Sequence, residues 1–95
     1  MGHRIELSEV ELAIERIQDI LRVCCIYEEK KDKIIAFYQG MAADKVIFEE
    51  LSKRLPSFMI PNQFRAVDKM PLSKNGKIDR KALMELYGGD EHGGR

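Results

Sequence analysis

Lys77 is the residue whose type and surroundings are best suited to chemistry, because it directly follows the turn-forming pair Asn75-Gly76. An Asn-Gly pair is a strong signal for a two-residue hairpin turn, since both central positions of the favoured turn need positive φ. The ammonium of a lysine is a compact charge with three donors on a flexible stem, which suits it to hold anionic oxygens. Most exposed lysines beside tight turns are plain surface residues, so the residue types alone leave both interpretations open.

The sequence lacks the other common catalytic patterns. No serine or cysteine has a plausible base, and His3 and His92 stand near the two ends, so no Cys and His cluster has metal-ligand spacing. The glycines of residues 88–94 follow the last expected helix, whereas a phosphate-binding loop opens one. Cys24 and Cys25 lie in an apolar run, where an extended chain sends adjacent side chains to opposite faces. We predict two buried structural thiols in a reducing compartment and no metal site.

Length and composition favour one small domain of a larger protein. The chain has 95 residues, of which 44% are hydrophobic, and this composition excludes a disordered chain. A domain of this size buries only about 60 to 65% of its unfolded surface, so two lobes around a nucleotide cleft are not expected. No stretch approaches the roughly 20 apolar residues of a membrane span, and no signal peptide is seen. We therefore expect a cytoplasmic module.

Charge is balanced overall but uneven along the chain. Basic and acidic residues both number 16, which indicates neither nucleic acid nor an anionic membrane as a partner. Residues 62–81 hold six lysines and arginines against two aspartates, whereas residues 1–20 hold two arginines against five acidic residues. The positive surface of the carboxyl-terminal half either faces an acidic partner or is an ordinary solvated surface.

The elements that must position Lys77 are predicted from hydrophobic spacing and turn signals. A capping box of Ser8 and Glu11, with a hydrophobic staple of Leu7 and Leu12, predicts a helix over residues 9–17. Its buried face is expected to consist of Val10, Ala13, Ile14 and Ile17.

A hairpin and a second helix are expected next. Residues 21–27 and 33–39 are rich in β-favouring residues on either side of a charged stretch, which predicts the hairpin, and residues 64–67 predict a third strand. Asp44 is expected to cap a helix that Pro56 ends, because the residue before proline is pushed out of helical geometry. The apolar face of this helix is expected to be Ile47, Phe48, Leu51 and Leu55.

The lysine segment leads into a last helix. Asp79 is expected to cap this helix, which runs through Leu83 and Leu86 and is ended by Gly88. Residues 88–95 have no apolar anchor and predict a flexible linker or tail. The order of helices and strands predicts a small α+β domain.

Three segments resemble, in order and spacing, the last three signature motifs of amino-acid-activating adenylation domains, and they are residues 2–11, 55–64 and 75–80. Such domains occur in nonribosomal peptide synthetases and belong to the adenylate-forming superfamily of acyl-CoA synthetases and luciferases. The resemblance implies that residues 1–87 are the small carboxyl-terminal subdomain of such an enzyme, a three-stranded sheet with flanking helices. It also implies that the amino-terminal adenylation subdomain, with its phosphate loop and amino-acid pocket, is absent from this sequence.

The resemblance implies roles for particular residues. The parent enzymes use ATP and magnesium to convert a carboxylate into an acyl adenylate, and then transfer the acyl group to the thiol of a phosphopantetheinyl carrier protein. Lys77 matches the catalytic lysine, a cation that stabilises charge developing between the carboxylate and ATP. Gly2, His3 and Arg4 match a loop that lines the path of the phosphopantetheine arm in the second step, where glycine permits close approach. The alternative for this loop is a frayed terminus.

The remaining motif residues allow simpler interpretations. Asp79 is either only a helix cap or a further functional part of the lysine motif, and Arg80 either pairs with an acid or docks against the large lobe. Residues 55–64 are expected to be structural, with proline fixing the path from helix to strand. The side chains expected to pack there are Phe58, Met59 and Ile60.

The sequence therefore predicts the mobile lid of an amino-acid-activating ligase, which alone is inactive and binds neither ATP nor magnesium. Two alternatives stay open. One is the lid of an acyl-CoA or aryl-acid ligase, and the other is a module that binds a carrier protein on its own through the positive segment of residues 62–81.

Overall fold

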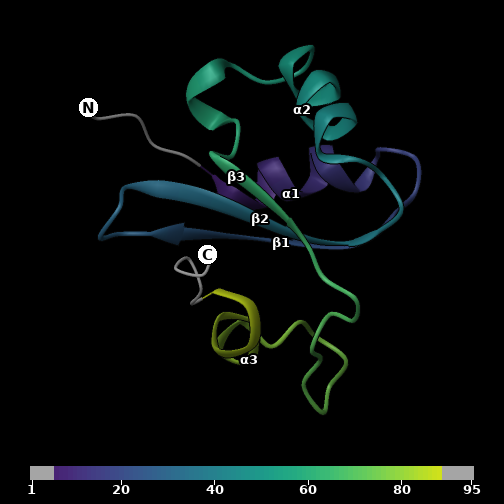
Figure 1. Ribbon diagram of the computed structural model, residues 1–95, viewed down its shortest axis with the longest axis vertical. Coiled ribbons are helices and arrows are strands. Elements are labelled where there is room, and N and C mark those ends of the chain that lie inside the picture. The colour runs from purple at the N-terminus through teal and green to yellow at the C-terminus, as the bar shows by residue number, and fades with distance from the viewer. Residues whose placement is uncertain (1–5, 89–95) are drawn as a thin grey trace.

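The chain folds around a three-stranded sheet that is covered by helices on both faces (Figure 1). The computed structural model describes residues 6–88. The elements are α1 (Leu7–Glu15), β1 (Ile20–Glu28), β2 (Lys33–Gly40), α2 (Asp44–Ser52), β3 (Gln63–Ala66) and α3 (Arg80–Leu83). A 3-10 helix, η1 (Ser57–Met59), precedes β3, and a π-helical turn, η2 (Met84–Gly88), follows α3. The predicted α+β fold with three strands is confirmed.

Strand β2 lies in the middle of the sheet, antiparallel to β1 and parallel to β3. The predicted hairpin is confirmed, and its register pairs Cys25 with Ala36. Strand β3 is parallel to β2 because the chain crosses back through α2 and η1 before it enters the sheet again. No helix within residues 6–88 is long and apolar enough to cross a lipid bilayer.

Each face of the sheet has its own apolar core. On one face, α1 and α2 bury Ile14 and Leu51 against the strands. On the opposite face, Phe37 of β2 and Leu83 of α3 belong to a second buried cluster. Figure 1 shows this division, with α1 and α2 on one side of the sheet and α3 on the other. The central strand therefore has both of its faces covered.

Helix α1 runs from Leu7 to Glu15, so it begins and ends two residues before the predicted bounds. On the predicted apolar face Val10 and Ile14 are buried and Ala13 is partly buried, while Ile17 is buried just beyond the end of the helix. The capping box is wrong, because the N-cap is Glu6 and no side chain bonds a free backbone N–H there. The hydrophobic staple is wrong as well, since Leu7 lies inside the helix and Leu12 is 55% exposed.

The predicted capping box failed because its acid has a distant partner. The Glu11 carboxylate accepts a hydrogen bond of 2.7 Å from the backbone N–H of Cys25 in β1. An edge strand offers unpaired backbone donors, and one of these outcompetes the N–H of Ser8 for the same carboxylate.

Helix α2 is capped one residue earlier than predicted. Ala43 is the N-cap, and the Asp44 carboxylate instead accepts a hydrogen bond from the hydroxyl of Tyr38. Burial and this bond raise the pKa of Tyr38 to about 12. The helix ends at Ser52, although the backbone N–H of Leu55 still bonds the carbonyl of Leu51 at 2.8 Å.

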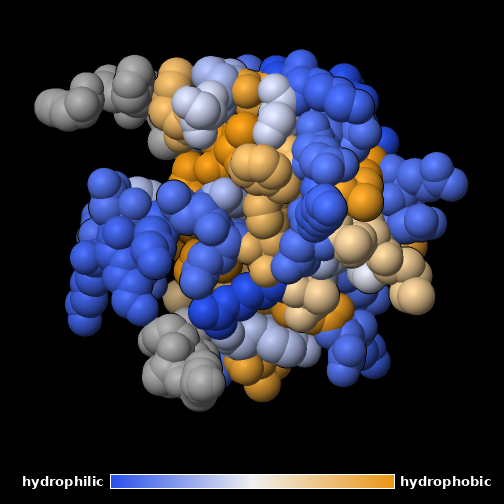
Figure 2. All heavy atoms as spheres, turned by 45° about the horizontal axis from the view of Figure 1, so that its top comes forward, coloured by the Kyte–Doolittle hydropathy of each residue, from blue (hydrophilic) through white to orange (hydrophobic). Residues whose placement is uncertain are grey.

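The segment between α2 and β3 is structural, as expected, but only part of it is buried. Met59 of η1 packs in the first core, and Ile60 is partly buried against it. Phe58 is 43% exposed, so it is less buried than its neighbour Met59. Phe48 of α2, which was expected on the buried face, is also half exposed. Figure 2 shows apolar side chains scattered among hydrophilic ones on this side of the molecule.

Gly40 permits a close approach at the end of the β1–β2 hairpin. A Cβ built at this position would lie 2.1 Å from the carbonyl oxygen of Asp19 and 2.9 Å from the Cα of Ile20. The φ of Gly40 is +151°, a value that other residues rarely adopt. The carbonyl oxygen of Asp19 also accepts the backbone N–H of Met41 at 2.8 Å. The backbone of Asp19 cannot move away from an added Cβ without losing this hydrogen bond.

We expect Gly40→Ala to lower the free energy of unfolding of the 95-residue chain by about 2 to 4 kcal/mol, because the methyl group overlaps backbone atoms at an unfavourable φ. Urea denaturation followed by circular dichroism measures the change. Gly76→Ala is the matched control, since Gly76 also has a positive φ of +82° but has nothing within 4 Å of an added Cβ. Its cost should be only about 1 to 2 kcal/mol. Equal losses for the two variants would contradict the close approach.

Candidate functional site

The lysine motif forms a small hairpin that projects from the body of the domain on the side of α3 (Figure 1). Leu72 and Ile78 pair across it as an antiparallel bridge. The backbone N–H of Ser73 bonds the carbonyl of Lys77 at 2.7 Å, and the N–H of Gly76 bonds the carbonyl of Ser73 at 2.9 Å. The motif is therefore a closed hairpin and not an open loop.

The turn has three loop residues and not the two that were predicted. They are residues 74–76, and among them only Gly76 has a positive φ. The geometry is that of a tight turn followed by a glycine in the left-handed region, which is the usual form of a three-residue hairpin loop. Asn75 contributes a backbone N–H that bonds the Ser73 hydroxyl oxygen at 3.3 Å. Lys77 still follows the glycine directly, on the returning arm of the hairpin.

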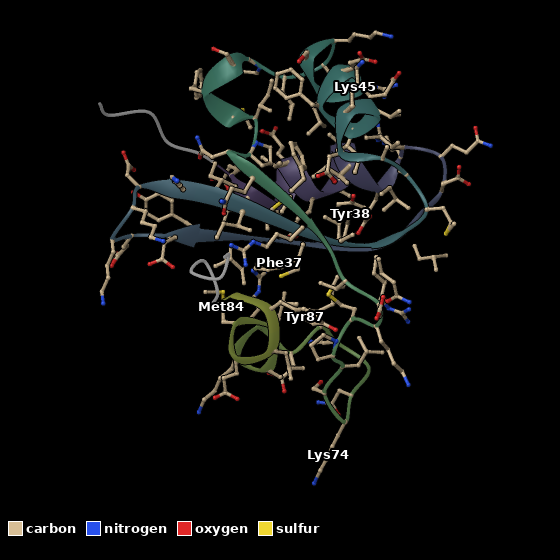
Figure 3. The ribbon with its side chains drawn as sticks, in the orientation of Figure 1. Phe37, Tyr38, Lys45, Lys74, Met84 and Tyr87 are labelled. Atoms are coloured by element: carbon tan, nitrogen blue, oxygen red, sulfur yellow. The ribbon has the colours of Figure 1, made fainter. Side chains whose placement is uncertain are left out.

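Lys77 is exposed, and within residues 6–88 no side chain or carbonyl holds its ammonium group by a hydrogen bond or an ion pair. Lys74, at the tip of the same hairpin, points away from the body of the domain (Figure 3). The hairpin thus carries two lysines in different places, one at the tip and one on the arm. Both ammonium groups are accessible to a second surface that approaches the hairpin.

Asp79 joins the hairpin to α3. Its side chain accepts the backbone N–H of Ala82 at 3.0 Å and caps the helix. Its own N–H bonds the carbonyl of Pro71 at 2.9 Å across the base of the hairpin, and its carbonyl accepts the N–H of Leu83 at 3.0 Å. One residue therefore fixes both arms of the hairpin and the first turn of the helix.

Arg80 ties α3 to the rest of the domain. Its Nη1 donates to the carbonyl of Cys25 at 3.0 Å, and its Nη2 lies 3.4 Å from the Glu11 carboxylate. Of the two predicted roles for Arg80, pairing with an acid is therefore observed, and the acid is Glu11. Glu11 is the residue of this arrangement that sequence reasoning missed. No local sequence signal indicates this role, because Arg80 lies 69 positions from Glu11.

The apolar residues around the hairpin hold it against the sheet. Ile78 packs on the second core, where Met70 is buried. The Gln39 side chain accepts the backbone N–H of Met70 at 3.0 Å, which attaches the segment before the hairpin to β2. Figure 3 shows Phe37 of the sheet and Tyr87 of η2 on the two sides of this core. The hairpin base is therefore anchored by both polar and apolar contacts.

The two cysteines are unsuited to nucleophilic chemistry. Both are free and buried, and they belong to opposite cores, Cys24 to the second and Cys25 to the first, as predicted. Burial raises the pKa of Cys24. Burial also raises the pKa of Cys25, and the neighbouring Glu11 charge raises it further. The thiols therefore stay protonated near neutral pH, whereas a reactive cysteine needs a lowered pKa.

Some predicted site residues cannot be placed. Gly2, His3 and Arg4, which were assigned to the thioester step, lie outside the described residues, as do residues 89–95 of the predicted tail. Within residues 6–88, no group of three or more His, Cys, Asp or Glu side chains is arranged to hold a metal ion.

Comparison with curated proteins finds relatives that are named as synthases and as carrier protein ligases. The chain is 39% identical to zwittermicin A synthase ZmaJ of Bacillus cereus over 98 residues, covering 96% of this chain and 18% of that protein. It is 32% identical to the D-alanine–D-alanyl carrier protein ligase of Staphylococcus aureus (strain Newman), covering 93% of this chain and 20% of the ligase. The chain therefore spans a fifth or less of the length of these relatives. No protein-family model matches it.

Solved structures agree with this fold. A four-domain nonribosomal peptide synthetase bound to AMP and glycine matches 86% of this chain and 6% of its own, with 34% identity and a TM-score of 0.72. NpsA of Klebsiella oxytoca, in complex with 3-hydroxyanthranilyl-AMSN, matches 90% of this chain and 18% of its own, with 25% identity and a TM-score of 0.83. The similarity again covers nearly all of this chain and a small part of each relative.

We expect Asp79→Ala to lower the free energy of unfolding of the chain by about 1 kcal/mol, because the N–H of Ala82 loses its capping acceptor. Asp79→Asn and Asp79→Ser keep a capping oxygen and should lose less. Urea unfolding of the three variants provides the comparison. Equal losses for all three would show that the charge of Asp79, and not the cap, holds the start of α3.

Proposed function

We propose that this chain, which is the carboxyl-terminal subdomain of an adenylate-forming enzyme like the peptide synthetases and the D-alanyl carrier protein ligase, is the lid of an amino-acid-activating ligase. In this proposal it supplies the lysine for adenylate formation. The observation that carries the proposal is the setting of Lys77, an exposed and unpaired cation on a hairpin with an anchored base. We assign residues 1–87 to this lid and residues 88–95 to a linker or tail.

The first reaction brings two anions together, and Lys77 is suited to lower the repulsion between them. A carboxylate oxygen attacks the α-phosphorus of ATP, and the bond from that phosphorus to the pyrophosphate oxygen breaks. This step brings an anion against a polyanion, so a cation placed between them lowers the repulsion and stabilises charge that develops on the phosphoryl oxygens. An ammonium with three donors can contact a carboxylate oxygen and a phosphate oxygen together.

The hairpin provides a way for the ammonium of Lys77 to reach the active site of a second lobe. Lys77 is an exposed residue of a hairpin that stands out from the body of the domain, so it could enter the cleft of a second lobe without burying the rest of the lid. The anchored base at Asp79 and Arg80 limits the positions that the ammonium can take. Preorganisation of this kind is what makes a single charge effective in a transition state.

ATP and magnesium would be bound mainly outside this chain. ATP is a substrate of the proposed reaction, and here only Lys77 is assigned to it. No cluster of three metal-ligating side chains occurs within residues 6–88, so we assign no magnesium ligand to the described part of the chain. The nucleotide and the amino acid would lie in the amino-terminal adenylation subdomain.

The second step transfers the acyl group to a carrier protein. The phosphopantetheine thiol attacks the acyl carbon, and AMP leaves with the electrons of the acyl phosphate bond. We assign Gly2, His3 and Arg4 to the path of the phosphopantetheine arm. The D-alanyl ligase is named for a carrier protein, which supports such a partner here. Its amino-acid substrate also favours an amino-acid activator over the alternative of an acyl-CoA or aryl-acid ligase.

In an adenylating enzyme that carries this chain as its lid, we expect Lys77→Ala to slow ATP–pyrophosphate exchange by about 10² or more, the usual effect of losing one preorganised electrostatic donor. Lys74→Ala is the matched control, because it removes a lysine from the tip of the same hairpin. That variant should keep exchange within about twofold of the parent, since a loop-tip substitution leaves the arm intact. Unchanged exchange with Lys77→Ala would overturn the proposed role.

The 95-residue chain alone, mixed with ATP, magnesium and amino acids, should catalyse no pyrophosphate exchange. The reason is that Lys77 alone, on its anchored hairpin, provides neither a nucleotide site nor an amino-acid pocket. The same assay with the amino-terminal adenylation subdomain added in trans is the positive control. Clear turnover by the chain alone would mean that it is a complete enzyme.

A further inference from the structure

The edge of β1 carries a closed set of hydrogen bonds that joins three parts of the chain. The Glu11 carboxylate of α1 accepts the N–H of Cys25 at 2.7 Å, and Arg80 of α3 donates to the carbonyl of the same Cys25 at 3.0 Å. The third side is the ion pair between Arg80 and Glu11 at 3.4 Å. We call this set the edge clamp. It occupies both polar groups of one residue on the free edge of the sheet.

The edge clamp lies close to Lys77 along the chain. Arg80 is the first residue of α3, and only Ile78 and Asp79 separate it from the lysine. The helix itself has four residues, so its own hydrogen bonds do little to fix its direction. A change in the position of Arg80 is therefore passed on to the base of the hairpin.

Glu11 is the most buried charged member of the edge clamp, and it contacts both other members. Its side chain is 18% exposed, whereas that of Arg80 is 56% exposed. A single oxygen, Oε2, faces both the Cys25 N–H and the Arg80 guanidinium. The carboxylate therefore sets where Arg80 lies on the edge of β1.

We propose that Glu11 is a positioning residue for Lys77, acting through Arg80 to hold the base of the lysine hairpin against β1. This inference rests on the proposed function of Lys77 in adenylate formation. Glu11 does not touch the reacting groups. Its carboxylate fixes the direction from which the ammonium is presented, and that direction matters because small misplacements of a catalytic group cost large factors in rate.

Glu11→Gln is the variant that tests the proposal, because it keeps the size of the side chain and removes its charge. The neutral amide oxygen is a weaker acceptor for the guanidinium than a carboxylate oxygen. In an adenylating enzyme with this chain as its lid, we expect ATP–pyrophosphate exchange to fall by about 10-fold to 10²-fold. Glu9→Gln, an exposed acid in the first turn of the same helix, is the matched control and should leave exchange unchanged.

Two further measurements separate positioning from a loss of stability. Transfer of the acyl group from a supplied aminoacyl adenylate to the carrier protein should keep its rate in the Glu11→Gln enzyme, since Lys77 has no part in that step. In a Lys77→Ala background, Glu11→Gln should cause no additional loss of exchange, because the group that it positions is gone. A structural defect would instead slow both steps and would add to the effect of Lys77→Ala.

The outcomes are distinguishable. A slow Lys77→Ala enzyme beside a normal Glu11→Gln enzyme would overturn this inference alone, and so would an additive loss in the double variant. Normal exchange by Lys77→Ala would overturn the proposed function, and this inference with it. If circular dichroism shows that Glu11→Gln does not fold, Arg80→Lys takes its place in every comparison, since a single ammonium cannot reach Cys25 and Glu11 in the same way as a guanidinium.

Discussion

Burial of both faces of β2 is the constraint on which the rest of this structure depends. Five consecutive residues of this strand, from Ile34 to Tyr38, are buried, and alternate side chains belong to opposite cores. A domain of 95 residues can cover two faces only if almost every element contributes. Helices α1 and α2 cover one face, and the second face is left to α3, η2 and the segments beside them.

The lysine hairpin is positioned by the packing of α3 on the second face of the sheet, because the hairpin leads directly into this helix. Helix α3 has four residues and contributes one fully buried side chain, Leu83. Full burial of a leucine stabilises by about 1.5 to 3 kcal/mol, which is small against the entropy of ordering the segment that carries it. Polar contacts therefore have to complete the attachment, and Asp79 and Arg80 make them. The residues that flank Lys77 in sequence are thus the ones that fix α3 in space.

Much of this arrangement was predictable because its causes are local. Adjacent positions of an extended strand face opposite ways, which placed the two cysteines, and Asp79 lies at the start of its helix with the acceptor that a free N–H requires. The failure at Glu11 has a cause that is distant in sequence. Glu11 satisfied a local capping pattern but bonds a strand edge and an arginine 69 positions away. A rule based on neighbouring residues cannot predict such a distant partner. The Asn-Gly pair correctly predicted a hairpin, but the predicted loop length of two residues was wrong.

The proposed lid function requires a domain that is rigid in itself if it is to move as a unit. Rotation of a domain can deliver a side chain accurately only when the side chain keeps its place relative to the domain. Here the base of the hairpin is fixed to β1, to β2 and to its own opposite arm, while the loop beyond it is exposed. The contacts are concentrated at the base of the hairpin, where a small displacement would move the ammonium of Lys77 by a larger distance. The flexible side chain of Lys77 allows the final adjustment of its position. In the proposed function, a rigid base with one mobile charge would let this small domain act within a cleft of the amino-terminal subdomain.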